Sequence, residues 1–247
     1  MIPLRLASRR WGDGDRRLLL IHGLSSNAAG WWRLGPDLAA AGFNVTAVDL
    51  RGHGASPHAH LYTLEAYAAD VLAAGDGWYG VLGHSLGGAV AVTAAAGDPT
   101  WTQRLVLYEP ALAMLDHEAA KVWLLAPWQG DISEEAVAAA NPEWNPEDVR
   151  HKARALAQTG PEVVTGTING NPSWDLRPQV GRLRMPVLIL AGDPARGSIV
   201  PRDALAEAAA ANPSIEVISC DGAGHSFHRE DDHYPSALAA VGGFFAG

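Results

Sequence analysis

The chain has 247 residues, 48% hydrophobic and 18% charged, a balance typical of a folded globular protein and not of a disordered or fibrous one. Its 27 acidic and 18 basic residues give a formal charge of −9, so we expect no nucleic-acid partner, because no basic stripe could neutralise a row of phosphates. The single cysteine, Cys220, excludes an intrachain disulfide, and without a run of about 20 apolar residues we expect no membrane span and a cytoplasmic protein.

Short apolar runs alternate with stretches of helical periodicity along most of the chain. In chain order we expect strands at 18–21 and 45–48, a helix at 63–72, a strand at 81–82, a helix at 86–96, strands at 105–108 and 187–191, a helix at 202–211, a strand at 215–218 and a closing helix at 235–245. Each apolar run is too short for a free-standing helix. The alternation predicts an α/β fold, with a mostly parallel, doubly wound sheet covered by helices.

Residues 111–177 break this alternation. They show no convincing strand pattern but hold helix formers, several prolines and four tryptophans. At this length one core with an insertion is a better expectation than two equal domains. We therefore expect a core of residues 1–110 and 178–247, and a helical cap, 111–177, inserted between two strands of one sheet.

The sharpest local motif is Gly83-His84-Ser85-Leu86-Gly87, which lies between a predicted strand and a predicted helix. In this setting a serine is exposed at the carboxyl edge of the sheet, and the following helix aims its first N–H groups at the reaction centre. The flanking glycines indicate that neither neighbour can be bulky. We therefore expect Ser85 to be a catalytic nucleophile.

A serine is a weak nucleophile unless a histidine takes its proton. His225 lies in a glycine-rich loop after the last predicted strand, from which its side chain could swing over the sheet edge. His228 is a competitor, but we expect it to begin a solvated helix together with the charged residues 229–231. His225 is therefore the predicted general base.

Two carboxylates compete for the role of the acid that orients the histidine. Asp193 directly follows the strand at 187–191 and gives the order Ser85, Asp193, His225, which is typical of hydrolases with a nucleophile elbow. Glu109 ends the preceding strand and is the alternative, although it could instead bond backbone N–H groups at the start of the cap or a substrate group. We expect Asp193 to be the acid.

Acyl transfer also needs hydrogen-bond donors for the developing oxyanion. The first should be the backbone N–H of Leu86, directly after the nucleophile. The second should be that of Leu24, because the strand at 18–21 ends in His22-Gly23. A largely apolar substrate pocket is expected from these side chains: Trp31, Trp32, His84, Glu109, Trp123 and Trp128.

These motifs together resemble the α/β-hydrolase superfamily. The resemblance is carried by His22-Gly23-Leu24, the segment 49–56, Gly83 to Gly87, Gly192-Asp193 and Gly224-His225. It implies a sheet of about eight strands, a site beneath the cap, and the roles given above to each residue. The segment 49–56 should have a structural role beside the strand at 18–21, which leads to the expected oxyanion donor, since its glycines fit a tight loop.

A serine at the elbow, where an aspartate would be needed, excludes the haloalkane dehalogenases and epoxide hydrolases of this superfamily. We expect hydrolysis of a carboxylic ester or lactone of a small, largely apolar molecule, by a monomer or homodimer that uses no cofactor or metal. The same triad also serves C–C bond hydrolases, thioesterases and amidases, and the same fold can act as a small-molecule receptor. These alternatives stay open at the level of sequence.

Overall fold

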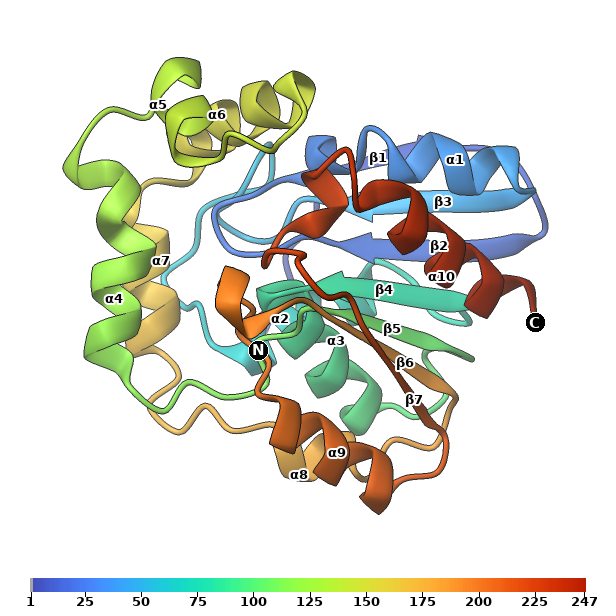
Figure 1. Ribbon diagram of the computed structural model, residues 1–247. Helices are drawn as coiled ribbons and strands as arrows, with labels where there is room; N and C mark the ends of the chain where they lie inside the picture. The colour runs from blue at the N-terminus through green and yellow to red at the C-terminus, as the bar shows by residue number, and fades with distance from the viewer. Residues whose placement is uncertain (1) are drawn as a thin grey trace.

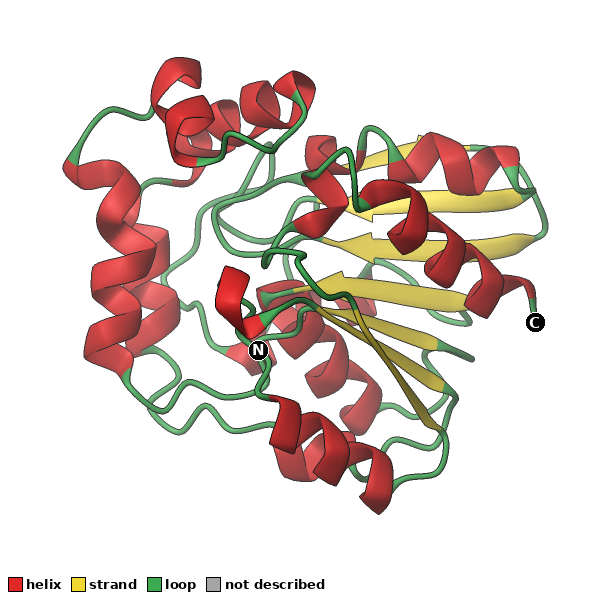
Figure 2. Cartoon of the chain, viewed as in Figure 1, coloured by secondary structure: helices red, strands yellow, loops and turns green. Residues whose placement is uncertain are grey.

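The computed structural model describes residues 2–247 and is built around a sheet of seven strands (Figures 1 and 2). The strands are β1 (Ser8–Trp11), β2 (Arg16–Ile21), β3 (Phe43–Val48), β4 (Gly80–His84), β5 (Leu105–Tyr108), β6 (Val187–Ala191) and β7 (Ile215–Ser219). Their order is β1-β3-β2-β4-β5-β6-β7, with β1 antiparallel to β3 and every other neighbouring pair parallel. The predicted α/β-hydrolase fold is confirmed.

The strand count differs from the expected eight, because within the described residues only one antiparallel strand accompanies the six parallel ones. That strand, β1, was not predicted. Its four residues, Ser-Arg-Arg-Trp, are mostly exposed, so they carry neither an apolar run nor a clear alternation. Charged residues of this kind protect a sheet edge from pairing with other chains.

Helices cover both faces of the sheet because the strands are apolar on both faces. In β2, Leu18 and Leu20 pack into one hydrophobic cluster, whereas Leu19 and Ile21 pack into the other. Helices α1 (Leu34–Ala40) and α10 (Tyr234–Ala246) cover the first face, and α2 (Leu64–Ala73), α3 (Leu86–Gly97), α8 (Arg177–Val180) and α9 (Arg202–Ala211) the second. Each fully buried leucine stabilises the fold by about 1.5–3 kcal/mol.

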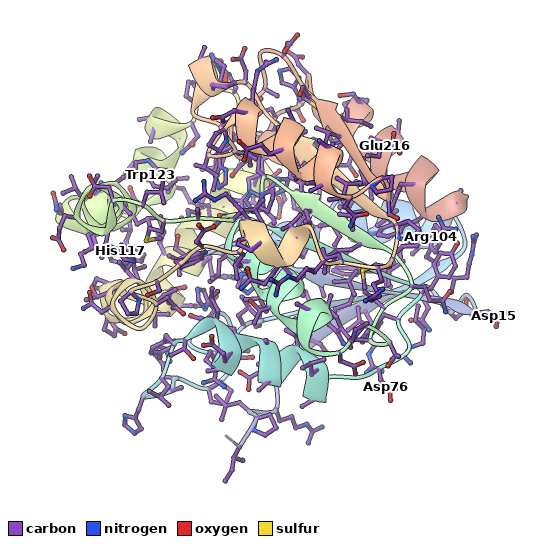
Figure 3. All side chains as sticks on the ribbon, turned by 90° about the horizontal axis from the view of Figure 1, so that it is seen from below. Asp15, Asp76, Arg104, His117, Trp123 and Glu216 are labelled. Carbon is purple, nitrogen blue, oxygen red and sulfur yellow. The ribbon has the colours of Figure 1, made fainter. Side chains whose placement is uncertain are left out.

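Of the five α-helices between β5 and β6 in the described residues, four lie beyond the carboxyl ends of the parallel strands (Figure 1). They are α4 (His117–Leu125), α5 (Glu134–Ala140), α6 (Pro146–Thr159) and α7 (Pro161–Asn169), with a 3-10 turn at Ala126–Gln129. Figure 3 shows Trp123 and His117 of α4 at the opposite end of the molecule from Asp15, Asp76 and Arg104, which precede β2, β4 and β5. No helix within residues 2–247 is both long and apolar enough to cross a bilayer.

The inserted segment is partly independent of the core and partly joined to it. Helices α5 and α6 share a small hydrophobic cluster of their own, whereas Val163 of α7 packs into the main core. The two ends of the insertion are paired, since Leu176 N–H donates to Leu112 O and Ala113 forms a β-bridge with Asp175. The division of the chain at residues 111 and 177 stays a prediction.

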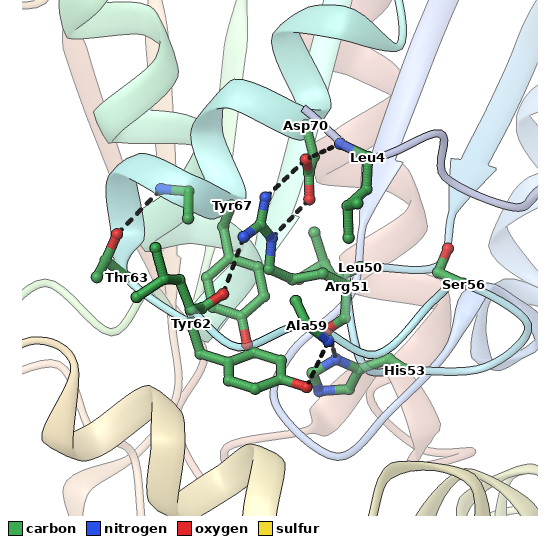
Figure 4. A network of polar contacts seen from close by, with 12 residues as sticks. Leu4, Leu50, Arg51, His53, Ser56, Ala59, Tyr62, Thr63, Tyr67 and Asp70 are labelled. Atoms are coloured by element: carbon green, nitrogen blue, oxygen red, sulfur yellow. Dashed lines mark hydrogen bonds and ion pairs between the residues drawn. The ribbon is translucent and has the colours of Figure 1, made fainter. Parts of the chain in front are cut away.

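A buried ion pair fixes the loop that follows β3 (Figure 4). Arg51 donates two hydrogen bonds to the Asp70 carboxylate, from Nε at 2.7 Å and from Nη2 at 2.8 Å. Its Nη1 donates to Leu61 O, and Asp70 also accepts from Leu4 N–H. Both charges are almost fully buried, so each depends on the other for compensation.

We predict that Asp70→Asn lowers the free energy of unfolding by about 3 kcal/mol, because it leaves the buried Arg51 guanidinium without a counter-charge. Urea denaturation followed by circular dichroism measures this loss. The matched control is Glu118→Gln, which breaks an exposed pair with Lys121 and should cost less than about 1 kcal/mol. Equal effects of the two substitutions would contradict the structural importance of the buried pair.

Candidate active site

A strained turn joins β4 to α3 and presents Ser85. The residue has φ 52° and ψ −117°, a conformation that a residue with a side chain rarely adopts and that costs on the order of 1–3 kcal/mol. The glycines around it are required by space. A Cβ on Gly87 would lie 2.2 Å from Ile21 O, and one on Gly83 would lie 2.3 Å from Gly87 O.

His225 is held by Glu109. Its Nδ1 lies 2.9 Å from Glu109 Oε2, and its backbone carbonyl lies 3.1 Å from Nε2 of His84, the residue before the serine. A hydrogen bond from Nδ1–H to the carboxylate leaves the lone pair of the imidazole on Nε2. This is the tautomer that a general base needs.

The Glu109 carboxylate is fully buried and is surrounded by donors. Oε1 accepts from Gly192 N–H and from Ser198 Oγ, both at 2.6 Å, and Oε2 accepts from Ile199 N–H at 3.0 Å in addition to His225. The backbone of Glu109 has φ 46°, which is a second site of strain directly after β5. Three groups from the loop after β6 thus fix the direction in which this carboxylate faces.

Asp193 does not occupy the position that we expected for it. Its Oδ1 accepts from Ala195 N–H at 2.9 Å, and its Oδ2 accepts from Gly222 N–H at 3.0 Å. These backbone hydrogen bonds hold the pKa of Asp193 below its ordinary value. The reason is local: Pro194 begins a 3-10 turn directly after Asp193, and capping that turn takes up the carboxylate. The expected contact with His225 is therefore wrong, and Glu109 makes it instead.

The two expected oxyanion donors lie beside Ser85. Leu24 and Leu86 line the same cavity as the serine, and a Cβ on Gly23 would lie 3.0 Å from Ser85 Cβ. The N–H of Leu86 belongs to the first turn of α3, where helical N–H groups have no partner within the helix.

The direction of the Leu24 N–H follows from its peptide plane. Gly23 O accepts from Ser26 N–H at 3.2 Å and lies 2.7 Å from His22 Nδ1. Because a trans peptide is planar, the carbonyl of Gly23 and the N–H of Leu24 point in opposite directions. Fixing the carbonyl on one side therefore aims the N–H at the other.

Two buried histidines, His22 and His53, support the turn formed by Gly23 to Ser26 and are not part of the cavity lining. His22 Nε2 accepts from Leu50 N–H at 3.0 Å, and His53 Nε2 accepts from Ser25 N–H at 3.2 Å. Burial lowers the pKa of His22 to about 4 and that of His53 to about 3, so both stay neutral at physiological pH and act as acceptors. The segment 49–56 thus has a structural position beside the oxyanion strand.

An apolar cavity of about 240 Å³ opens at Ser85. Its lining consists of Leu24, Ser85, Leu86, Ala111, Ala113, Met114, Leu115, Asp116, Ala120, Trp123, Leu124, Trp174 and Ile199. Asp116 is the one charged residue in that lining, and no cation is among them. A second hollow of about 330 Å³ lies among polar residues near Glu143 and His233, and its lining includes none of Ser85, Asp193 and His225.

Of the side chains expected to line the pocket, Trp123 does so, and its ring centroid lies 6.2 Å from that of His225. Trp31 is instead buried against His228, and Trp128 packs on the hydrophobic cluster of α5 and α6. Both tryptophans bury aromatic surface in hydrophobic packing away from the cavity, Trp31 almost completely and Trp128 in part. Trp32 lies beneath the Arg33 guanidinium.

His84 is buried below the serine, with its ring 4.7 Å from that of His228. The expectation that residues 228–231 form a solvated helix start is wrong for the first three of them, which are buried. Arg229 donates from Nη2 to Ser26 Oγ at 2.9 Å, and its guanidinium lies over the Trp144 ring. Burial lowers the pKa of His228 well below its ordinary value. Within residues 2–247, no group of three or more His, Cys, Asp or Glu side chains has an arrangement that could hold a metal ion.

The chain matches the model of the alpha/beta hydrolase family over residues 18–241. It is 33% identical to pimeloyl-[acyl-carrier protein] methyl ester esterase of Klebsiella pneumoniae over an alignment of 230 positions, which covers 87% of this chain and 88% of the relative. It is 28% identical to N-formylmaleamate deformylase of Pseudomonas putida over an alignment of 252 positions, which covers 96% of this chain and 88% of the relative. Among solved structures, the enol-lactonase of Burkholderia xenovorans superposes with a TM-score of 0.81 at 21% identity, covering 98% of this chain and 96% of the other.

The tight packing of the elbow gives a testable consequence. We predict that Gly87→Ala lowers the free energy of unfolding by about 2–3 kcal/mol, because the added methyl group meets backbone atoms of β2 that cannot turn aside. Gly97→Ala, at the other end of α3 with no heavy atom within 4 Å of the added Cβ, is the control and should be neutral or slightly stabilising. Guanidinium denaturation measures both, and an undiminished stability of Gly87→Ala would disprove the packing argument.

Proposed function

This chain belongs to the alpha/beta hydrolase family, and from that premise we propose that it cleaves a carboxylic ester or lactone of a small, largely apolar molecule through an acyl-enzyme on Ser85. The observation that carries the proposal is the contact between His225 and the buried Glu109, made beside a strained serine. In this proposal the catalytic residues are Ser85, His225 and Glu109. Asp193, our first expectation for the acid, is replaced because its carboxylate caps a turn.

The proposed reaction uses the groups already described. His225 Nε2 takes the proton of Ser85 Oγ while the oxygen attacks the substrate carbonyl, and the N–H groups of Leu24 and Leu86 stabilise the oxyanion. The imidazolium then gives its proton to the departing alcohol. Water, deprotonated by His225, hydrolyses the acyl-enzyme and restores Ser85. Glu109 stabilises the imidazolium in both halves of the cycle.

The cavity favours an uncharged acyl group. Its lining is mainly aliphatic and aromatic, with one carboxylate at Asp116 and no cation, so an anionic substrate group would find no counter-charge there. The esterase from Klebsiella pneumoniae, by its name, acts on a methyl ester, which supports ester cleavage in this chain. We further propose that a monomer or homodimer meets this substrate in the cytoplasm.

Amide hydrolysis is the second candidate. The relative from Pseudomonas putida is named as a deformylase and matches this chain over 96% of its length. An amide would use the same serine, base and oxyanion donors, with proton transfer to the leaving nitrogen as the added demand. Comparing a p-nitrophenyl ester, a lactone, a thioester, a C–C-linked vinylogous diketone and an N-formyl amide of matched size separates the candidates.

We predict that Ser85→Ala lowers kcat for a short-chain p-nitrophenyl ester by roughly three orders of magnitude or more, because no acyl-enzyme can form. Its thermal midpoint should stay close to that of the wild type, since a half-buried hydroxyl contributes little packing. Cys220→Ser is the control, because it removes the lone thiol and should leave kcat unchanged. Full activity in Ser85→Ala would disprove the proposed nucleophile.

We predict that Glu109→Gln lowers kcat by about four orders of magnitude, because an amide N–H facing His225 Nδ1 favours the wrong tautomer. Asp193→Asn should keep most of the activity, since this side chain bonds the backbone N–H groups of Ala195 and Gly222 and not His225. Steady-state kinetics on the two variants, with circular dichroism to check folding, gives the comparison. The opposite order of effects would return the acid role to Asp193.

A further inference from the structure

A lysine of the cap binds the turn that carries the expected oxyanion donor. Lys152 of α6 donates from Nζ to Ser25 Oγ at 2.7 Å and to Ser25 O at 2.9 Å. Ser25 directly follows Leu24. The proposed mechanism does not use Lys152, and the contact joins the inserted segment to the loop after β2.

Ser25 holds a backbone conformation that needs support. Its φ is 53°, in the left-handed region where a turn normally places glycine. The turn from Gly23 to Ser26 closes through Ser26 N–H to Gly23 O, and Ser25 is its third residue. A strained residue persists only where its surroundings fix it.

The polar groups of Ser25 are held from two sides. On the core side, His53 accepts a hydrogen bond from the Ser25 N–H. On the cap side, Lys152 donates to the carbonyl and the hydroxyl of Ser25. Releasing the Lys152 side would let Ser25 relax toward a negative φ. The turn hydrogen bond from Ser26 N–H to Gly23 O would then weaken, leaving His22 Nδ1 as the remaining contact on that carbonyl. The peptide between Gly23 and Leu24 would be held less firmly, and the Leu24 N–H would turn away from Ser85.

We propose that Lys152 is a positioning residue that holds Ser25 and thereby aims the Leu24 N–H at the oxyanion, an inference that rests on the proposed function. The oxyanion hole is then complete only when α6 is docked on the core. Loss of this support should lower kcat more than it raises KM, since the substrate carbonyl carries little negative charge before the serine attacks.

The charges around Lys152 make its contact sensitive to pH. Arg229 faces it from the loop after β7, and the neutral His22 and His53 face it from the loops after β2 and β3. Asp148, on α6 itself, faces Arg229. Burial and the Arg229 charge lower the pKa of Lys152 to about 7. The ammonium form therefore prevails below this pH, and above it the weaker, neutral donor replaces it.

The chain offers a control for the docking of α6 as such. Asn27 Nδ2 donates to Gln158 Oε1 at 2.9 Å, so Gln158 also joins α6 to the same loop, two residues beyond Ser25. Removing this contact loosens the cap without touching the strained residue. Gln158→Leu therefore separates cap docking from support of the oxyanion turn.

The test compares Lys152→Met, Lys152→Arg and Gln158→Leu with the wild type on a p-nitrophenyl ester between pH 6 and 9. Lys152→Met should lower kcat by about tenfold at pH 6.5 with KM within about twofold, since a small misplacement of a catalytic group is costly. Binding of a trifluoromethyl ketone, which forms a tetrahedral oxyanion on serine, should weaken in proportion. Gln158→Leu should stay within about twofold of the wild type.

The pH profile gives a second readout. Wild-type kcat should decline above about pH 7, Lys152→Met should lose this decline, and Lys152→Arg should keep most of the activity without it, because a guanidinium stays charged. Three results would each overturn this inference without affecting the proposed function. The first is a folded Lys152→Met whose kcat and inhibitor affinity are unchanged. The second is a loss of kcat in Gln158→Leu equal to that in Lys152→Met, and the third is a Lys152→Arg whose kcat declines above pH 7 as in the wild type. A wild type without Ser85-dependent turnover overturns the proposed function, and this inference with it.

Discussion

The fully buried carboxylate of Glu109 is the constraint on which the rest of the site depends. An ionised group inside a protein must be matched by donors or by charge, and here Gly192, Ser198, Ile199 and His225 supply the donors. Three of these groups come from the loop after β6 and one from the loop after β7. One carboxylate therefore joins the carboxyl ends of three adjacent strands, and His225 takes its position from that junction.

The fold was predictable because it follows from patterns within short stretches of chain. Buried strands such as residues 187–191 are continuous apolar runs, and the elbow around Ser85 favours glycines because a Cβ at Gly83 or Gly87 would meet backbone atoms. The exposed strand β1 escaped prediction, since a charged edge strand leaves no such pattern. Short helix α1 escaped for a related reason, because seven residues interrupted by Gly35 and Pro36 show little periodicity.

The site was harder to predict where it depends on contacts between distant segments. The order of residues along the chain favoured Asp193 as the acid. Whether Asp193 or Glu109 contacts His225 depends, however, on where the two side chains point after β6 and β5. Pro194 gives a local reason for the outcome, because it starts a turn that Asp193 caps. The sequence near Arg229 and Lys152 holds no such signal. Arg229 donates to Ser26, which is 203 positions away, and Lys152 donates to Ser25, which is 127 positions away.

The cap differs along its length in how it meets the core. Lys152 and Gln158 of helix α6 bond the loop after β2, and the N–H of its N-cap residue Asn145 donates to Arg229 O in the loop after β7. On α4, Val122 and Trp123 have large exposed fractions, as has Leu115 just before the helix, and both Leu115 and Trp123 line the cavity. Entry of an apolar substrate past α4 would thus leave the α6 contacts in place. In the cap, α6 thus holds the loop that carries Leu24, and α4 borders the cavity with partly exposed apolar side chains.

The paired ends of the insertion decide where the cap could be exchanged for that of another family member. Ala111 N–H donates to Ser85 O, and Ala111 O accepts from the Trp174 indole, so a graft cut at residue 111 would remove part of the elbow's own support. The bridge between Ala113 and Asp175 lies two residues beyond Ala111 at one end of the insertion, but Trp174 lies on its cap side at the other. Chimeras joined after Ala113 and before Trp174 would exchange most of the cavity lining while keeping the native contacts that support Ser85.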